Sequence, residues 1–139
     1  MKNVDSYYDF ADSSYYTLKR MLDAGIFEND CCVLANSIVE RYLKHVITVL
    51  YDVNNDEDFG RKAVILKSHS LKGLCGFINH NKLMSELNHD IINQADGYHR
   101  SARYPGDDAI FVTNDDVNSA WQAVEYCKQA VDNALTKKD

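Results

Sequence analysis

Residues 29–50 read NDCCVLANSIVERYLKHVITVL. Apolar side chains recur in this stretch at steps of three and four residues, which places them on one face of an α-helix. They are Cys32, Ala35, Ile38, Val39, Tyr42, Val46, Val49 and Leu50. Asn29 or Asp30 can cap the first turn. The stretch therefore predicts a helix of about six turns with one buried side.

The segment before this helix has the same spacing. Residues 4–22 carry an apolar side chain at every third or fourth position, and Gly25 follows at a C-cap position. The short connection between the two helices predicts an antiparallel hairpin. After the long helix, residues 52–60 read DVNNDEDFG. This sequence is acidic, aperiodic and rich in turn formers, which predicts a loop that extends to about residue 66.

Three further segments complete the pattern. Residues 68–78 and 83–102 each place apolar side chains on one helical face, and the second stops before Pro105. Residues 113–116, TNDD, form a capping box of the type S/T-x-x-D/E. This box opens a last helix whose apolar positions run to Leu135.

The composition agrees with a helical chain. Its 139 residues include one proline and six glycines, and 45% are apolar. Alternating strand patterns are limited to weak apolar runs at residues 63–66 and 109–112, and no internal repeat or domain boundary appears. We therefore expect an all-α fold, a single domain over residues 1–139 built as a five-helix up-down antiparallel bundle.

The sequence also bears on location and on the cysteines. Its apolar runs are short and its opening residues are polar, so we expect a cytoplasmic protein without a membrane span or signal peptide. Cys31, Cys32, Cys75 and Cys127 form no CxxC pair, which predicts reduced core thiols and no metal site. Nucleophilic catalysis would need an exposed cysteine near a histidine, for which Cys75 is only a remote candidate.

Charge is distributed unevenly along this acidic chain, whose net charge is −6. Residues 1–40 hold three Lys and Arg against seven Asp and Glu, and residues 104–139 repeat that ratio. Residues 41–103 hold nine basic against seven acidic side chains, together with all five histidines. The overall charge disfavours general duplex binding, whereas the middle segment is where a phosphate-bearing ligand is expected.

The most unusual stretch is residues 98–106, YHRSARYPG. Arg100 and Arg103 lie three residues apart on one helix face, with His99 and Tyr104 beside them. Guanidinium groups suit bidentate contact with phosphate, and tyrosine rings suit stacking on bases. The alternative interpretation is a helix C-terminus whose arginines complement the helix dipole, followed by a turn.

A second polar feature is His69, within SHSL at residues 68–71. In the first turn of a helix, beside free backbone amides, a histidine can donate to a phosphate. A histidine bonded near a helix start explains the residue equally well. Glu40 and Lys44 form an i,i+4 pair, for which surface decoration is a sufficient explanation. Our hypothesis is one polar cleft that accepts phosphate and is lined by Arg103, Arg100, Tyr104, His99, His69 and Lys44.

Several motifs in order resemble the HEPN family, the nucleotide-binding domain of higher eukaryotes and prokaryotes. The long helix bears Ala35 and residues 40–44, ERYLK, which are similar to the family pattern A-x-E-K-x-L-K. Residues 68–71, SHSL, are similar to T-H-x-L, and residues 102–106, ARYPG, to A-R-Y-P-[DG]. Thr113 then opens the last helix. The resemblance covers nearly the whole chain, from about Tyr8 to Leu135.

The resemblance implies an up-down helical bundle that forms a homodimer with a cleft between the protomers. It implies a nucleotide or RNA ligand, and pairing with a minimal nucleotidyltransferase as in toxin–antitoxin systems. The helices also carry more tyrosines than one small core needs, and aromatic residues are favoured at interfaces. These tyrosines are Tyr7, Tyr8, Tyr15, Tyr16, Tyr42 and Tyr126.

Relatives that are ribonucleases use an arginine followed, after four to six residues, by a histidine. If Arg103 is that arginine, the corresponding positions hold Asp108, Ala109 and Ile110. The general base of RNA cleavage is then missing or comes from another part of the chain. We therefore expect a non-catalytic nucleotide- or RNA-binding protein, without a cofactor or an assigned catalytic residue.

Two other interpretations remain open. One is a divergent, metal-independent endoribonuclease of the host-defence or toxin type, with a site built from Arg103, Tyr104, His99 and His69. The other is a dimerisation scaffold that binds no ligand.

Overall fold

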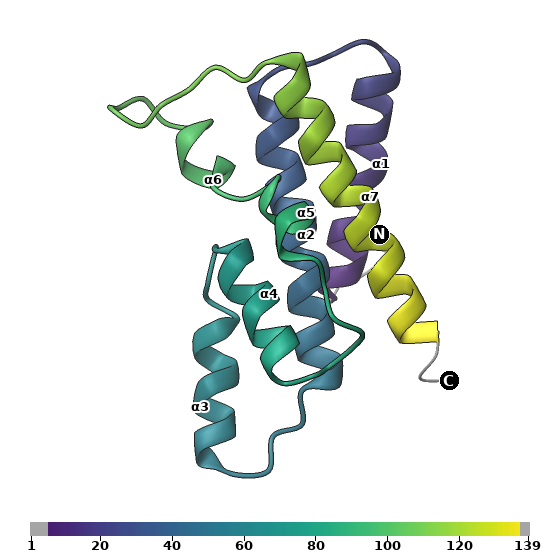
Figure 1. Ribbon diagram of the computed structural model, residues 1–139, viewed down its shortest axis with the longest axis vertical. Helices are drawn as coiled ribbons and strands as arrows, with labels where there is room; N and C mark the ends of the chain where they lie inside the picture. Colours follow the sequence, from purple (N-terminus) through teal and green to yellow (C-terminus); the bar gives the residue numbers. More distant parts are fainter. Residues whose placement is uncertain (1–5, 137–139) are drawn as a thin grey trace, which may run out of the picture.

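The computed structural model describes residues 6–136, except for the side chain of Arg100. Within this range the chain is all-helical, without a strand, as expected from the sequence. The helices are α1 (Tyr7–Asp23), α2 (Asn29–Leu50), α3 (Asp56–Ile65), α4 (Leu71–His80), α5 (His89–Asn93), α6 (Tyr98–Ser101) and α7 (Asn114–Thr136). The described part thus has seven helical segments instead of the expected five (Figure 1).

The expected antiparallel hairpin of α1 and α2 is confirmed (Figure 1). Gly25 adopts a φ of 80°, the left-handed conformation that glycine accepts without strain. Its amide donates to the carbonyl of Leu22, and the amide of Ile26 donates to that of Met21, both at 3.0 Å. These two bonds form a Schellman motif, which ends α1 and turns the chain into α2. Residues 4 and 5, expected in this helix, lie outside the described residues.

α2 forms the centre of the fold, because α1, α4, α6 and α7 all pack against it. The apolar residues buried along it are Cys31, Cys32, Ala35, Ile38, Val39, Tyr42, Leu43, Val46 and Ile47. Val49, expected on the same face, is exposed at the end of the helix. Full burial of a large apolar side chain contributes about 1.5–3 kcal/mol, so the burial of this row stabilises the fold.

The helix directions differ from an up-down antiparallel arrangement. α2 and α7 start at the same end of the molecule and run in the same direction, while α1 runs opposite to both (Figure 1). The side chain of Asn29, the first residue of α2, joins these starts. Its Oδ1 accepts from the amide of Val112 at 2.8 Å, just before α7. The segments α3 to α6 carry the chain back to this end.

The predicted loop over residues 52–66 is wrong, because most of it is helix α3. The Asn55 side chain caps the helix by accepting from the amide of Asp58 at 2.8 Å. Asp56, Glu57 and Asp58 then occupy the first turn, where carboxylates are stabilised by the helix dipole. The cluster of acids and turn formers is therefore a helix start.

The predicted helix over residues 83–102 is also wrong, because it is divided into α5 and α6. The Asn79 side chain bonds to both the amide and the carbonyl of Leu87, at 2.8 and 3.0 Å, and holds that backbone outside a helix. Asn88 caps α5, and Gly97, with a φ of 85°, breaks the chain between α5 and α6. Local side-chain bonds and one glycine thus outweigh the apolar periodicity.

The capping box that opens α7 is confirmed. The amide of Thr113 donates to Asp116 Oδ2 at 2.9 Å, and the amide of Asp116 donates to Thr113 Oγ1 at 3.1 Å. Each side chain thus satisfies a backbone donor that the helix leaves unpaired.

The predicted burial of the cysteines is confirmed, because all four thiols are free and buried in the core. Burial raises the pKa of the Cys75 thiol to about 11 and that of the Cys32 thiol to about 12. A raised thiol pKa disfavours the nucleophilic thiolate, so Cys75 does not suit nucleophilic catalysis. Among the described residues, no helix is long and apolar enough to cross a membrane.

A charged side chain, Lys128 of α7, lies among three tyrosine rings. Its Nζ is 5.6 Å from the ring centre of Tyr8, 5.2 Å from that of Tyr15 and 5.6 Å from that of Tyr42. Asp12 Oδ1 accepts from both Lys128 Nζ at 2.8 Å and the Tyr42 hydroxyl at 2.6 Å. We call these five residues the tyrosine cage. It joins α1, α2 and α7 by cation–π contacts and charge-assisted hydrogen bonds.

The cage predicts a loss of stability at alkaline pH. Burial, together with a hydrogen bond to Asp132, raises the pKa of Tyr8 from 10.0 to about 12. Burial and a hydrogen bond to Glu125 raise the pKa of Tyr15 to about 12 as well. As the pH rises, tyrosine in the unfolded chain loses its proton before Tyr8 and Tyr15 do in the folded protein. The stability that these two raised pKa values contribute is therefore complete below pH 10.0 and disappears as the pH rises toward about 12.

We therefore expect the urea midpoint of unfolding to fall between about pH 10 and about pH 12. The double variant Tyr8→Phe, Tyr15→Phe is the control, since it cannot ionise at these positions. Its midpoint should fall less steeply over the same range, and an equal slope would contradict the assignment to the two tyrosines.

Candidate functional site

Five polar residues from separate segments come together beside α2. Glu40 and Lys44 belong to α2, and His69 lies in the turn between α3 and α4. His99 belongs to α6, and Arg103 follows that helix. We call these residues the histidine–arginine cluster. Four of them, all but Glu40, were predicted site residues.

Contacts run through the cluster from one end to the other. Lys44 Nζ bonds to Glu40 Oε2 at 3.1 Å, and Glu40 Oε1 lies 3.1 Å from His69 Nδ1. The rings of His69 and His99 stack with their centres 4.4 Å apart and their planes at 9°. His99 Nδ1 lies 3.5 Å from Arg103 Nη1. The cluster is thus continuous from the interior to exposed Arg103.

The interior end of the cluster corrects our interpretation of Glu40 and Lys44 as surface decoration. Their side chains are only 12% and 7% exposed. At that burial a charge needs a partner, because an unpaired one would lose its hydration without compensation. Lys44, predicted to contact phosphate, instead pairs with Glu40 beneath the surface.

The position of His69 also differs from the prediction. α4 begins at Leu71 with Ser70 as its cap, so His69 precedes the helix and does not occupy its first turn. The amides at this helix start are not free, because those of Leu71 and Lys72 donate to the Asp96 carboxylate, both at 3.1 Å. Asp96 therefore fixes the turn that presents His69. Its carboxylate also occupies the positive end of the α4 dipole, where a phosphate was expected to bind.

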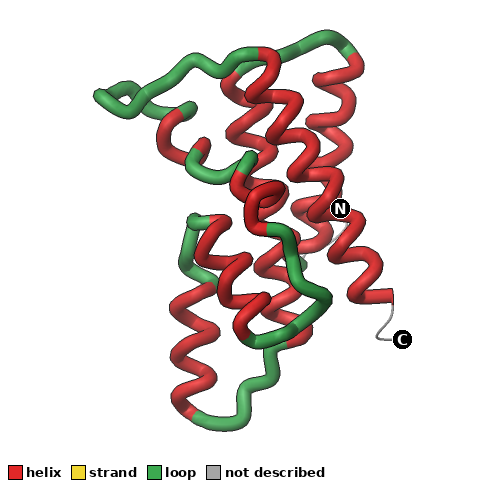
Figure 2. The backbone as a smooth tube through the Cα atoms, in the orientation of Figure 1, coloured by secondary structure: helices red, strands yellow, loops and turns green. Residues whose placement is uncertain are grey.

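The segment that carries His99 and Arg103 is held by Asn29 at the start of α2. The Nδ2 of Asn29 donates to the carbonyl of Ile110 at 2.8 Å and lies 3.4 Å from that of Ala102. The long connection between α6 and α7 is therefore tied to the bundle, although it is a loop (Figure 2). The sequence predicts a helix cap at Asn29, but this residue is the first of α2 and its side chain bonds to the connection between α6 and α7.

The structure brings together only part of the predicted cleft. A hollow of about 440 Å³ is lined by Arg103 and Tyr104, together with Asn29, Pro105 and Phe111. His69, His99 and Lys44 do not line it. Tyr104 is exposed, and its ring lies 5.2 Å from the Arg103 guanidinium carbon. The side chain of Arg100 lies outside the described part of the chain, so its place relative to the hollow stays a prediction.

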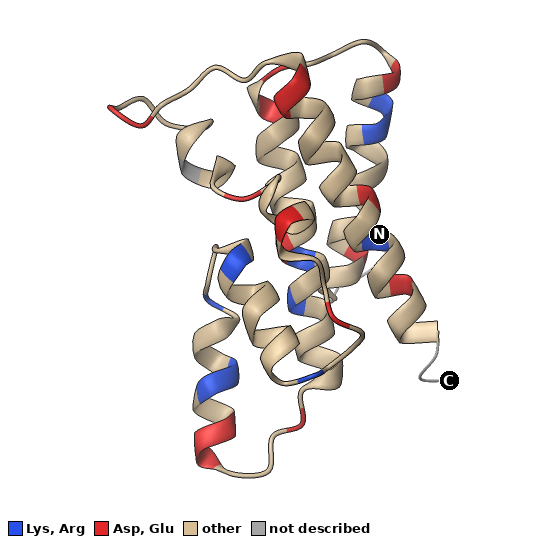
Figure 3. Ribbon diagram, viewed as in Figure 1, with Lys and Arg blue, Asp and Glu red and all other residues tan. Residues whose placement is uncertain are grey.

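The chemistry of the cluster suits an anion. Imidazole and guanidinium groups donate hydrogen bonds, and guanidinium stays charged at all working pH values. Lys67 and Lys72 flank His69 in sequence, and Figure 3 shows basic positions on α2, at the start of α4 and in the turn before it. Among the described residues, no group of three or more histidine, cysteine or acidic side chains is placed to hold a metal ion.

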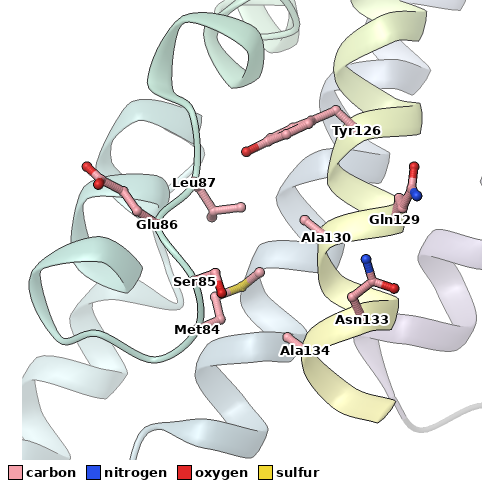
Figure 4. Close-up of a pocket in the computed structure, with 9 residues that line it drawn as sticks. All are labelled: Met84, Ser85, Glu86, Leu87, Tyr126, Gln129, Ala130, Asn133 and Ala134. Carbon is pink, nitrogen blue, oxygen red and sulfur yellow. The ribbon is translucent and has the colours of Figure 1, made fainter. Parts of the chain in front are cut away.

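A second hollow lies between the segment before α5 and α7, with a volume of about 320 Å³ (Figure 4). Met84, Leu87, Ala130 and Ala134 give it an apolar floor, and Glu86 is the only charged residue among the described ones that line it. Without a cation, this hollow does not suit phosphate.

The chain was compared with protein-family models, curated proteins and solved structures, and none of them matched it.

Proposed function

We propose that the protein binds the phosphate of a nucleotide or RNA through His69, His99 and Arg103, as a non-catalytic module of the HEPN type. The observation that carries this proposal is the convergence of these side chains. They come from two segments 30 residues or more apart in sequence, and their contacts of 4.4 Å and 3.5 Å form a row of donors.

The row keeps hydrogen-bond donors available to a ligand. A guanidinium can only donate, so His99 Nδ1 accepts from Arg103, which leaves Nε2 as the donor of that ring. A phosphate bound across the row would accept bonds from the remaining donors of the imidazoles and the guanidinium. Exposed Tyr104 supplies a ring beside Arg103 on which a base can stack.

The partners follow from the HEPN resemblance. We propose a homodimer, and a nucleotidyltransferase encoded nearby as the partner of a toxin–antitoxin pair. The tyrosine argument for the dimer is weaker than the sequence indicated, because Tyr8, Tyr15 and Tyr42 pack within one protomer around Lys128. Tyr7 and Tyr16 are the exposed tyrosines of α1.

Arg103→Ala is expected to weaken binding by roughly 1.5–3 kcal/mol, about ten- to a hundred-fold, because it removes a charge-assisted contact to phosphate. Calorimetric titration of ATP, GTP and a short RNA against both proteins measures the difference. Lys19→Ala, which removes an exposed cation from α1, is the matched control and should bind like wild type.

Two results would refute the site. One is a wild-type protein that binds none of the three ligands at about millimolar concentration. The other is an Arg103→Ala variant that binds as tightly as wild type.

A second candidate function is metal-independent RNA cleavage, and the Glu40–His69 bond is the observation that favours it. A carboxylate on Nδ1 fixes the imidazole and leaves Nε2 to accept a proton, as a general base requires. The RNA 2′-oxygen would attack the adjacent phosphorus while His69 takes its proton. The 5′-oxygen would leave with a proton from His99, which gives a 2′,3′-cyclic phosphate and a 5′-hydroxyl.

The RNA arm of the titration separates the two functions. RNA recovered after incubation in EDTA stays intact if the protein only binds. Fragments ending in cyclic phosphate, absent with a His69→Ala variant, would instead establish the ribonuclease.

A further inference from the structure

α3 stands at the edge of the fold, where its main helical neighbour within the described chain is α4 (Figure 1). Within Asp56–Ile65 no residue is buried. The side of α3 that faces the protein carries Asp58, Lys62 and Ile65, which are half-buried. Asp58 accepts from the Tyr51 hydroxyl, and Lys62 donates to the carbonyls of Thr48 and Tyr51.

The opposite side of α3 is apolar and exposed. Phe59 is 68% and Val64 73% exposed, and Ala63 lies between them on the same face. Asp56, the first residue of α3, begins this stripe, and Lys67, in the turn just after the helix, ends it. Figure 3 shows the separation of charge, with acidic residues at the start of α3 and basic ones toward α4. Large exposed apolar side chains on one helix face indicate an interaction surface.

The order of residues along the stripe is complementary to itself. Suppose that a second α3 lies antiparallel across the stripe, with the two-fold axis between Arg61 and Lys62. The numbers of any two residues that face each other then have the same sum. Asp56 then faces Lys67, Phe59 faces Val64, and Gly60 faces Ala63. The acidic residue of each copy thus meets the basic residue of the other, and the phenylalanine of each copy meets the valine of the other. The small residues, glycine and alanine, meet beside the axis.

We propose that α3 is a homotypic interface, at which two copies of this chain associate through antiparallel α3 helices. Isologous contact of this kind requires a surface that is complementary to itself under two-fold rotation, which the stripe from Asp56 to Lys67 is.

The residues nearest the axis are compatible with close approach. Gly60 costs helix stability compared with alanine, yet a Cβ built on it would meet nothing within 4 Å among the described residues. This open space lets the partner's Ala63 approach the backbone. Arg61 and Lys62 do not bring like charges together, because Arg61 turns toward Glu57 and Asp58, and Lys62 toward the end of α2.

The interface is small, since about three turns of helix contribute from each copy. Interfaces of this size are transient, so the dimer is expected to dissociate on dilution, with a dissociation constant on the order of 10⁻⁴ M. This interface specifies the contact of the homodimer proposed above and rests on that part of the proposed function. It is independent of the phosphate site, because no residue of the histidine–arginine cluster belongs to α3.

Charge reversal tests the pairing. Asp56→Lys and Lys67→Asp each replace two attractive contacts per dimer with two repulsive ones, so each is expected to weaken association about ten-fold. The double variant Asp56→Lys, Lys67→Asp restores opposite charges and should associate within about three-fold of wild type. Sedimentation equilibrium from about 10 µM to about 1 mM at low salt measures all four proteins.

Two further variants complete the experiment. Asp115→Lys changes the same charge at an exposed first-turn position of α7 and should leave association unchanged. Val64→Asp places an unpaired charge opposite the partner's Phe59 and should abolish association. Circular dichroism checks that this exposed change leaves the fold intact. A monomeric wild type, a double variant as weak as the single ones, or a Val64→Asp dimer would each overturn the α3 interface.

Discussion

Tyr42→Ala is expected to lower the free energy of unfolding by about 3–5 kcal/mol. Tyr42 is fully buried at the centre of α2, and its ring packs at 63° against that of Tyr8 with the centres 5.5 Å apart. The substitution removes this ring from the core and leaves a cavity. It also removes the hydroxyl bond to Asp12 and one of the three rings around Lys128. Urea unfolding followed by circular dichroism measures the loss.

Two variants separate the contributions to this loss. Tyr42→Phe keeps the ring and removes only the hydroxyl, while Asp12 keeps its bond from Lys128, so a loss of about 1–1.5 kcal/mol is expected. Tyr16→Ala removes an exposed tyrosine from α1 and should cost less than about 1 kcal/mol. If Tyr42→Ala costs no more than Tyr16→Ala, the tyrosine cage does not stabilise the fold.

The parts of the fold that the sequence predicted are those with strong local signals. α2 and α7 have long apolar periodicity, α7 also has its capping box, and Gly25 marks the turn of the hairpin. The predicted cap of α2 at Asn29 or Asp30 is wrong, because Glu28 precedes the first turn and no side chain caps it. α3 was missed because acids and turn formers suit a loop and a helix start equally well. The break at Gly97 was missed because a single glycine inside a periodic segment is often tolerated.

The tyrosine cage could not have been predicted from the sequence. Lys128 lies between buried positions of α7, and a lysine in an amphipathic helix normally reaches solvent. Asp12 and Lys128 are 116 residues apart. Only tertiary packing shows that Tyr8, Tyr15 and Tyr42 surround the same charge.

The candidate site was predicted in its residue types and only partly in its arrangement. His69, His99 and Arg103 are close together, as expected from their chemistry. Glu40 was missed, although Asn36, Glu40 and Lys44 form a row of polar residues at steps of four inside an apolar helix. Such a row indicates a polar network on the buried side of the helix, because isolated polar groups are costly to bury.

Glu40 therefore supplies the second large effect. Glu40→Ala is expected to lower the free energy of unfolding by about 3 kcal/mol, because it leaves the Lys44 ammonium nearly buried without its partner. Glu57→Ala is the matched control, since Glu57 and Arg61 form the same i,i+4 pair with side chains 79% and 58% exposed. The control should lose less than about 0.5 kcal/mol.

The double variant Glu40→Ala, Lys44→Met assigns the cause. It removes one negative and one positive charge together, so the net charge beside the phosphate site stays the same. Stability should return to within about 1 kcal/mol of wild type, because no buried charge remains unpaired. His69 has nevertheless lost the carboxylate that holds its Nδ1, so affinity for the nucleotide or RNA should stay about ten-fold below wild type.

These two measurements answer different questions about Glu40. A double variant as unstable as Glu40→Ala would show that unpaired Lys44 is not the source of the loss. A stable double variant that binds its ligand as tightly as wild type would show that Glu40 does not orient His69. If Glu40 of the buried ion pair orients His69, the double variant should recover its stability but not its affinity.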